Sequence, residues 1–194
     1  RMPVLMGRYN VPHFDAKGEA NALFASRVPT TLLYTSFYWD NLIHFGMQPQ
    51  RGADGVLNFV LPMGEAKLPG IAAADIGVCA FDIFARGEEL IGKSIGIAGE
   101  HLSGAQMAEQ LALALGEPVR HVALTPPQYA ALGFPGADDL ANMFQFKTEF
   151  EHMYGSARRI ECTRELNPQL QSFAQWLAGN AKHLPIEPRV GAPA

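Results

Sequence analysis

The chain has 194 residues, of which 48% are hydrophobic and 18% charged, and its formal net charge is −4. A chain of this length and apolar content can bury a hydrophobic core, and the low charged fraction excludes an extensively disordered protein. The small negative charge gives no electrostatic basis for binding nucleic acid or an anionic membrane. We therefore expect a folded protein that binds neither.

Cysteine and histidine spacing predicts no metal or redox site. The two cysteines, Cys79 and Cys162, lie far apart, and the histidines show no metal-ligand spacing. Cys79 falls within an apolar run, which favours a small buried side chain. No stretch has the length of a membrane span, and no signal peptide is recognised. We expect a cytoplasmic location, extending to the nucleus if the source is eukaryotic.

The first elements along the chain predict a helix, a strand and a turn. Residues 12–26 begin with a proline and carry apolar side chains at three- and four-residue steps, as in an amphipathic helix. Residues 28–36, VPTTLLYTS, are short and rich in β-branched residues, which predicts a buried strand. Residues 37–46 predict a short helix or wide turn, with Trp39 and Phe45 packed in the core.

The middle of the chain predicts alternating strands and helices. Residues 56–62 form a strand pattern, and a glycine-containing turn leads to a second extended piece at 67–71. Asp75 is expected to cap a helix that stops at Gly87. Residues 93–99, KSIGIAG, predict another short strand.

The remaining segments complete an α/β pattern. Ser103 and Gln106 form a capping box for a helix that ends at Gly116, and residues 119–124 alternate like a half-buried strand. Three further helical segments are expected, at 125–136, 138–150 and 167–179, the last capped by Asn167. Short strands alternating with helices indicate an α/β fold, but the strands are too few for a complete doubly wound sheet.

Several motifs resemble those of the NmrA-like family, an atypical branch of the short-chain dehydrogenase/reductase superfamily. The likeness is closest to redox-sensing members and covers nearly the whole chain after the first ten residues. It is carried by HFDAKGEANALF, FYWDNL, ADIG, LGFPGADDLANMFQF and NPQLQSFAQWL.

The resemblance implies the C-terminal part of a Rossmann-type doubly wound sheet plus a small α+β domain on the substrate or partner side. Residues 1–50 would supply the last helix and strand elements of the dinucleotide-binding domain. Residues 51–194 would form mostly the C-terminal α+β subdomain, with some segments returning to the sheet.

The family holds the dinucleotide pyrophosphate on a glycine-rich turn after its first strand, where the backbone can approach phosphate at a helix N-terminus. No such motif follows a strand here, because the glycines of GKSIGIAG flank a strand instead. The resemblance therefore implies that the N-terminal glycine-rich half is absent from this chain. Binding of NADP(H) or NAD(H) would require that half.

The resemblance assigns a catalytic and cofactor-binding role to Lys17 and a catalytic position to His13. In the superfamily, a lysine one helical turn after a tyrosine binds the nicotinamide ribose and lowers the pKa of the phenol. Here His13 stands where the tyrosine would be. A histidine can act as a general acid, but it replaces the phenol poorly, and it can equally be a helix-start residue bonded to nearby groups.

The segment TSFYWDNL corresponds to the end of the family strand beside the nicotinamide. The resemblance places Ser36, Phe37 and Tyr38 near the cofactor, with Asn41 fixing the following turn. Many family members carry proline in place of Ser36, so this contact differs from the usual pattern.

Three functions remain open from the sequence. The first is a redox sensor that binds NAD(P)(H) with little or no turnover and signals to a regulatory protein partner or homodimer through the C-terminal subdomain. The second is an active NAD(P)H-dependent oxidoreductase of a small carbonyl or quinone. The third is an isolated fragment without cofactor binding.

Overall fold

The computed structural model describes residues 9–187, and the fold is α/β. The strands of this part of the chain form three small sheets with parallel pairs in each. The sheets are β1 (Leu32–Tyr34) with β6 (Ser94–Gly96); β2 (Phe37–Tyr38), β5 (Lys67–Ile71) and β7 (Glu100–Ser103); and β3 (Gln50–Arg51), β4 (Leu57–Val60) and β8 (Val119–Val122).

Helices occupy most of the remaining chain. The α-helices are α1 (Pro12–Ala25), α2 (Asn41–His44), α3 (Ala73–Arg86), α4 (Gly104–Leu115), α5 (Pro126–Ala130), α6 (Ala137–Glu149), α7 (Glu151–Ser156), α8 (Ile160–Leu166) and α9 (Phe173–Asn180). Short 3-10 turns follow α3 at η2 (Gly87–Leu90) and α9 at η3 (Ala181–His183). None of the helices within residues 9–187 is both long enough and apolar enough to cross a membrane.

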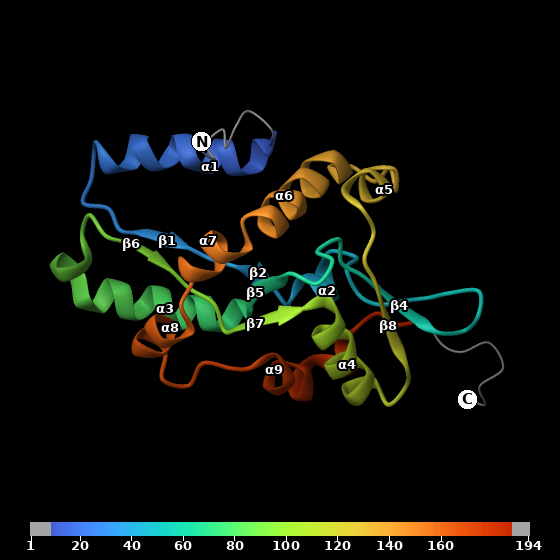
Figure 1. Ribbon diagram of the computed structural model, residues 1–194. Helices are drawn as coiled ribbons and strands as arrows, with labels where there is room; N and C mark the ends of the chain where they lie inside the picture. The colour runs from blue at the N-terminus through green and yellow to red at the C-terminus, as the bar shows by residue number, and fades with distance from the viewer. Residues whose placement is uncertain (1–8, 188–194) are drawn as a thin grey trace.

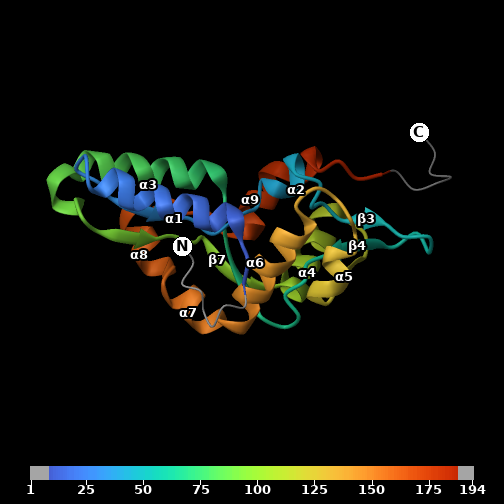
Figure 2. The ribbon, with the colours of Figure 1, turned by 90° about the horizontal axis from the view of Figure 1, so that it is seen from above.

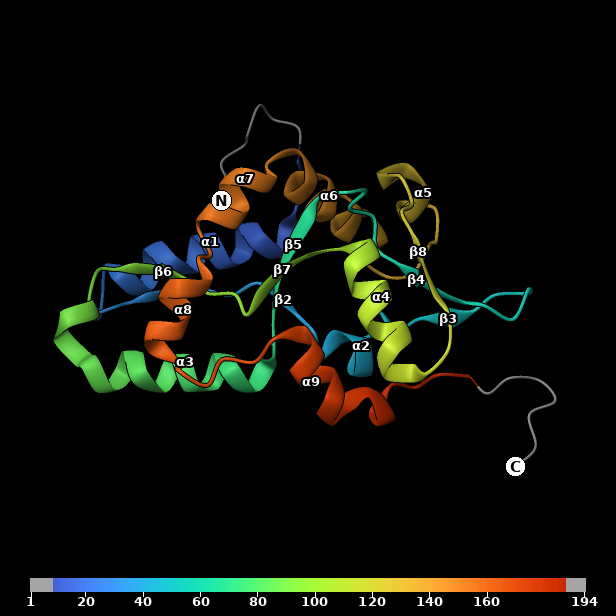
Figure 3. The same cartoon turned by 60° about the horizontal axis from the view of Figure 1, so that its bottom comes forward.

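The β1–β6 pair lies between two helices. Figure 1 shows α1 on one side of these strands and α3 on the other, and the tilted view of Figure 3 shows the same order. Seen from above in Figure 2, β3, β4, α4 and α5 gather at one end of the molecule, whereas α3 and α8 lie at the other. Within the described residues β1 pairs with β6 alone, so its second edge is open.

The larger hydrophobic core is centred on an aromatic cluster. Trp39 is 1% exposed, and its ring centroid lies 5.3 Å from that of Phe173 and 6.3 Å from that of Trp176. Gly70 on β5 permits this packing, because a Cβ at that position would lie 2.3 Å from the Trp39 indole nitrogen. The aromatic cluster therefore packs α9 against the sheet that contains β2.

Many predicted elements are confirmed. The helix at 12–26 is α1, and the Ser103–Gln106 capping box opens α4, which ends at Gly116 in the left-handed conformation. Trp39 and Cys79 are buried as expected. Sequence reasoning missed β7, α7 and α8, which are too short to show a clear hydrophobic period.

Three predicted burial patterns are wrong. The strand expected over 28–36 shortens to Leu32–Tyr34 and is half-buried, because its outer edge has no neighbour in the described chain. Phe45 is 75% exposed rather than packed in the core. On α1 the apolar side chains of Leu23 and Phe24 are also exposed, since α1 overlies an open cleft instead of a packed sheet.

Asp75 and Asn167 do not cap helices as the sequence predicts. Helix α3 begins at Ala73, and α9 begins at Phe173 with a Ser172–Gln175 capping box. The two mispredicted residues meet instead: Asn167 Nδ2 donates to Asp75 Oδ1 at 2.9 Å, with both side chains buried. Gln171 donates its backbone N–H to Asp75 Oδ2 at 3.1 Å. These tertiary hydrogen bonds outweigh local capping.

Replacing Asp75 with alanine is expected to lower the free energy of unfolding by about 1–3 kcal/mol, because it leaves the buried Asn167 amide without its acceptor. Chemical denaturation measures this change. Asp138→Ala, in the exposed first turn of α6, is the matched control and should cost less. Equal losses for the two variants would contradict the importance of the buried network.

Candidate functional site

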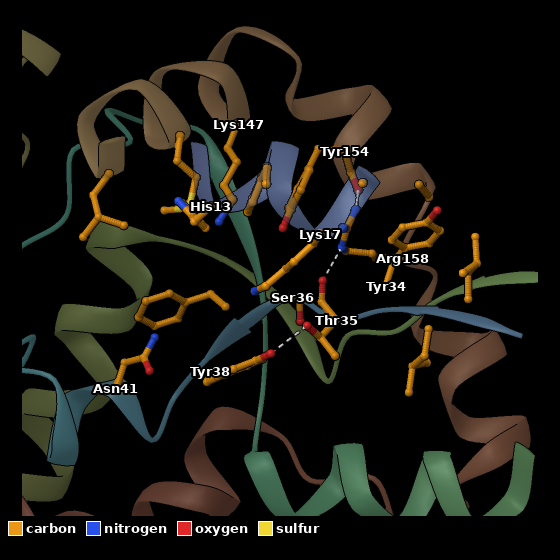
Figure 4. A pocket seen from close by; sticks show the side chains of 18 of the residues that line it. His13, Lys17, Tyr34, Thr35, Ser36, Tyr38, Asn41, Lys147, Tyr154 and Arg158 are labelled. Carbon is orange, nitrogen blue, oxygen red and sulfur yellow. Dashed lines mark hydrogen bonds between the residues drawn. The ribbon is translucent and has the colours of Figure 1, made fainter. Parts of the chain in front are cut away.

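A cleft of about 1990 Å³ runs between α1 and the carboxyl ends of β1 and β2. Helices α6 and α7 close one side of it, and its lining is mainly apolar (Figure 4). In open α/β sheets, ligands characteristically bind at the carboxyl ends of parallel strands. All six residues singled out from the sequence line this cleft: His13, Lys17, Ser36, Phe37, Tyr38 and Asn41.

Lys17 lies on the cleft side of α1. Although the residue as a whole is exposed, Figure 4 shows its side chain extending toward the part of the cleft where Ser36 and Tyr38 lie. The helical spacing brings Lys17 one turn beyond His13. The ammonium is thus available to a ligand at the end of β1.

His13 is held by a carboxylate from another helix. Its Nδ1 lies 2.7 Å from Asp139 Oδ1 on α6, and its backbone N–H donates to Asp139 Oδ2 at 3.4 Å. Asp139 therefore accepts from both the ring and the backbone at the start of α1, which joins α1 to α6. The alternative considered from the sequence, a bonded helix-start residue, fits this geometry.

Ser36 follows the end of β1 and carries an unsatisfied polar atom. The residue is 8% exposed, and its Oγ is buried without a hydrogen-bond partner in the described part of the chain. Buried hydroxyls are seldom left unpaired, because the loss of water contacts is costly. A ligand in the cleft could supply the missing hydrogen bond.

The neighbouring residues are fixed by the protein. The Tyr38 hydroxyl lies 3.0 Å from Thr35 Oγ1, and the Arg158 Nε–H donates to the Thr35 carbonyl at 2.9 Å. Phe37 is buried within β2, whereas Asn41 begins α2 and lies half-buried at the cleft. Phe37 therefore contributes mainly to the packed floor, and the other groups form a rigid polar rim.

Lys147 is the functional candidate that sequence reasoning missed. It is 4% exposed, lines the cleft from α6, and lies within a cage of three aromatic rings. The distances from its Nζ to the ring centroids are 5.8 Å to Phe14, 5.5 Å to Phe144 and 5.3 Å to Tyr154. The helical period could have revealed it, because Lys147 lies one turn beyond Phe144 on the buried face of α6.

Burial disfavours the charged form of Lys147. Desolvation and, to a smaller extent, the positive charge of Arg158 together lower the pKa of its ammonium to about 7. Within the described residues, no hydrogen bond or ion pair engages Lys147 Nζ. The guanidinium of Arg158 also stacks on the Tyr154 ring, with its central carbon 3.8 Å from the ring centroid.

The sequence model of the NmrA-like family matches residues 5–177. The geometry defines an α/β protein with parallel strand pairs and a large cleft at the carboxyl ends of β1 and β2. By the extent of the family match, the chain belongs to the NmrA-like family.

Known proteins of two kinds are similar to this chain. An NAD(P)H azoreductase from Xenophilus azovorans is 32% identical over 100 residues, which is 50% of this chain and 33% of the azoreductase. An NADPH-dependent quinone oxidoreductase from Escherichia coli, solved with NADPH, superposes with a TM-score of 0.66 and 20% identity over 91% of this chain and 61% of its own.

A regulator shares the fold as well. NmrA, a negative transcriptional regulator solved with NADP, gives a TM-score of 0.64 and 19% identity over 86% of this chain and 56% of its own. The chain thus spans about a third of the azoreductase and about three fifths of the two solved structures.

Lys147→Met is expected to stabilise the protein, and more strongly at pH 6 than at pH 9. The pKa of Lys147 is lower in the folded state than in the unfolded chain, so unfolding takes up a proton and wild-type stability rises between about pH 7 and 10. Below pH 7 Lys147 is charged in the folded protein, so the full destabilising effect of the buried charge is present. Methionine removes that charge. Melting temperatures of both proteins across this range measure the difference.

Lys182→Met, at an exposed position outside the cleft, is the matched control. A stability gain from Lys147→Met that does not change with pH would contradict the lowered pKa.

Proposed function

We propose that this chain is part of a nicotinamide-dinucleotide-binding reductase whose substrate is a conjugated, electron-poor acceptor. NADP(H) or NAD(H) would place its nicotinamide ribose against Lys17 and Ser36. When bound, the dihydronicotinamide supplies a hydride. The quinone and azo reductases among the similar proteins support this substrate class, as does the mainly apolar lining of the cleft.

The unsatisfied Ser36 hydroxyl is the observation that carries the proposal. It is buried at the end of β1, in the cleft that Lys17 also lines. A ribose or carboxamide group offers both donors and acceptors, so it can pair with Ser36 Oγ while another oxygen accepts from the Lys17 ammonium. Two polar groups on opposite walls would orient the ligand between them.

The dinucleotide phosphates would be bound by a glycine-rich turn on polypeptide outside this sequence. The open edge of β1 supports this arrangement, because a parallel strand could continue the sheet there. Residues 1–50 would then be the last elements of the dinucleotide-binding domain, and 51–194 mostly the C-terminal subdomain. The pairing of β6 with β1 supports the return of one later segment to the sheet.

The second candidate is a redox sensor with little turnover, which signals to a protein partner or a second copy. One observation favours it: the position of the superfamily tyrosine holds His13, which is engaged by Asp139. That pair joins the cofactor-side helix α1 to α6, so a dinucleotide that moves α1 could shift the C-terminal subdomain. Such a signal requires different affinities for the two conformations.

Lys17→Ala in the full-length protein is expected to weaken NADPH binding by roughly 10- to 100-fold, the usual cost of losing a hydrogen bond from a charged group. Ser36→Ala should weaken it by a smaller factor. Isothermal titration calorimetry measures both, with the exposed Lys182→Ala as the matched control. Unchanged affinity in Lys17→Ala would remove Lys17 from the site.

Turnover separates the two candidates. The reductase predicts NADPH oxidation when the full-length protein is mixed with neutral quinones or azo compounds, followed by the fall in absorbance of the reduced nicotinamide. Tight NADPH binding with no turnover on any acceptor would favour the sensor. Protein without NADPH or NADH affinity would reject both.

A further inference from the structure

The reduction needs a source of protons, and position 13 does not provide the usual phenol. Hydride addition to a carbonyl carbon or to a conjugated quinone leaves negative charge on oxygen, which must be protonated or stabilised. His13 is engaged by Asp139, and Lys17 is assigned to the ribose. A proton donor must therefore come from the other titratable groups of the cleft.

Those groups come from several elements packed around the cavity. They are His13 and Lys17 on α1, Tyr34 on β1, Tyr38 on β2, Glu88 in η2, Tyr129 on α5, Lys147 on α6, Tyr154 on α7 and Arg158 after it. Burial raises the pKa of Tyr129 and Tyr154 above the ordinary phenol value, so neither releases a proton readily. The Tyr38 hydroxyl is hydrogen-bonded to Thr35. The guanidinium of Arg158 holds its own protons too tightly to donate one.

Lys147 differs from the other groups because its ammonium is buried and yet has no hydrogen bond or ion pair in the described chain. Ring faces surround this ammonium, and in the described chain no carboxylate pairs with it. A buried ammonium without a counter-charge is costly, so proteins rarely keep one unless it has a function. Figure 4 shows Lys147 extending from α6 toward the space that Lys17 enters from α1.

We propose that Lys147 is a catalytic residue that donates a proton to the substrate oxygen as hydride arrives, and that the cage selects a planar quinone-type carbonyl compound. This inference rests on the proposed reductase function. The half-buried ring of Phe14, which lines the cleft beside the ammonium, offers a flat apolar face against which a conjugated ring can pack.

The proton transfer balances the reduction. The acceptor gains two electrons and one hydrogen nucleus as hydride from the dihydronicotinamide, which is oxidised. One Lys147 N–H bond breaks while an O–H bond forms on the acceptor, which gives the hydroquinone. The neutral amine then takes a proton from water. A pKa of about 7 suits this cycle, because the amine can both release and regain its proton near neutral pH.

The test is a kinetic comparison of wild type, Lys147→Met and Lys147→Arg in the full-length protein, with NADPH and a neutral benzoquinone. Lys147→Met should lower kcat/KM by roughly 100- to 1000-fold, the usual contribution of a general acid, with NADPH affinity unchanged. Wild-type kcat/KM should fall as pH rises through 7, because the donor must be protonated. That fall should disappear in both variants.

Lys147→Arg distinguishes proton transfer from charge alone. Arginine keeps the positive charge but cannot release its proton, so it should not restore the rate. Full activity in Lys147→Arg, or a wild-type pH profile in Lys147→Met, would overturn the inference. Lys93→Met, at an exposed position outside the cleft, should behave as wild type.

A second readout does not depend on turnover. The NMR signal of the Lys147 Cε–Hε group, assigned by its loss in Lys147→Met, should titrate near pH 7 in the protein without cofactor. Titration at the ordinary lysine value near 10.5 would overturn the inference while leaving the reductase intact. Absence of NADPH binding in wild type would instead reject the proposed function itself.

Discussion

The position of α1 is the constraint on which the site depends. This helix carries His13, Phe14 and Lys17, yet it buries none of its residues, so packing alone does not fix it. It is held by contacts with α6: Asp139 accepts from His13, and the ring of Phe14 lies beside the Lys147 ammonium. The position of Lys17 over the strand ends is therefore set by the His13–Asp139 hydrogen bond and the Phe14 contact, together with the hydrogen bond from Asn142 Nδ2 to the Asn10 carbonyl.

Helix α6 consequently joins two sides of the same cleft. Its first turn fixes α1 through Asp139, and its last turn presents Lys147 to the cavity. The Phe14 ring beside the Lys147 ammonium belongs to the helix that carries Lys17, so both ends of α6 contact the same helix.

Much of the fold was predictable, because local patterns specify it. The Ser103–Gln106 capping box and the left-handed Gly116 bound α4 through interactions within a few residues. Asp75 and Asn167 carry equally good capping signals, but they are 92 residues apart and hydrogen-bond to each other. Local reasoning fails there because the competing partner is distant in sequence.

Local patterns along the chain were enough to predict the alternation of helices and strands, the family likeness, and the residues that line one cleft: His13, Lys17, Ser36, Phe37, Tyr38 and Asn41. The packing of distant segments was needed to show that His13 is hydrogen-bonded and that the Ser36 hydroxyl is unsatisfied. The tertiary structure also revealed Lys147. A lysine is expected to be exposed, and its burial becomes visible only when the three surrounding rings, from three helices, are placed in space. Burial and pairing depend on residues that meet in space, and their distance along the chain hides them from a linear pattern.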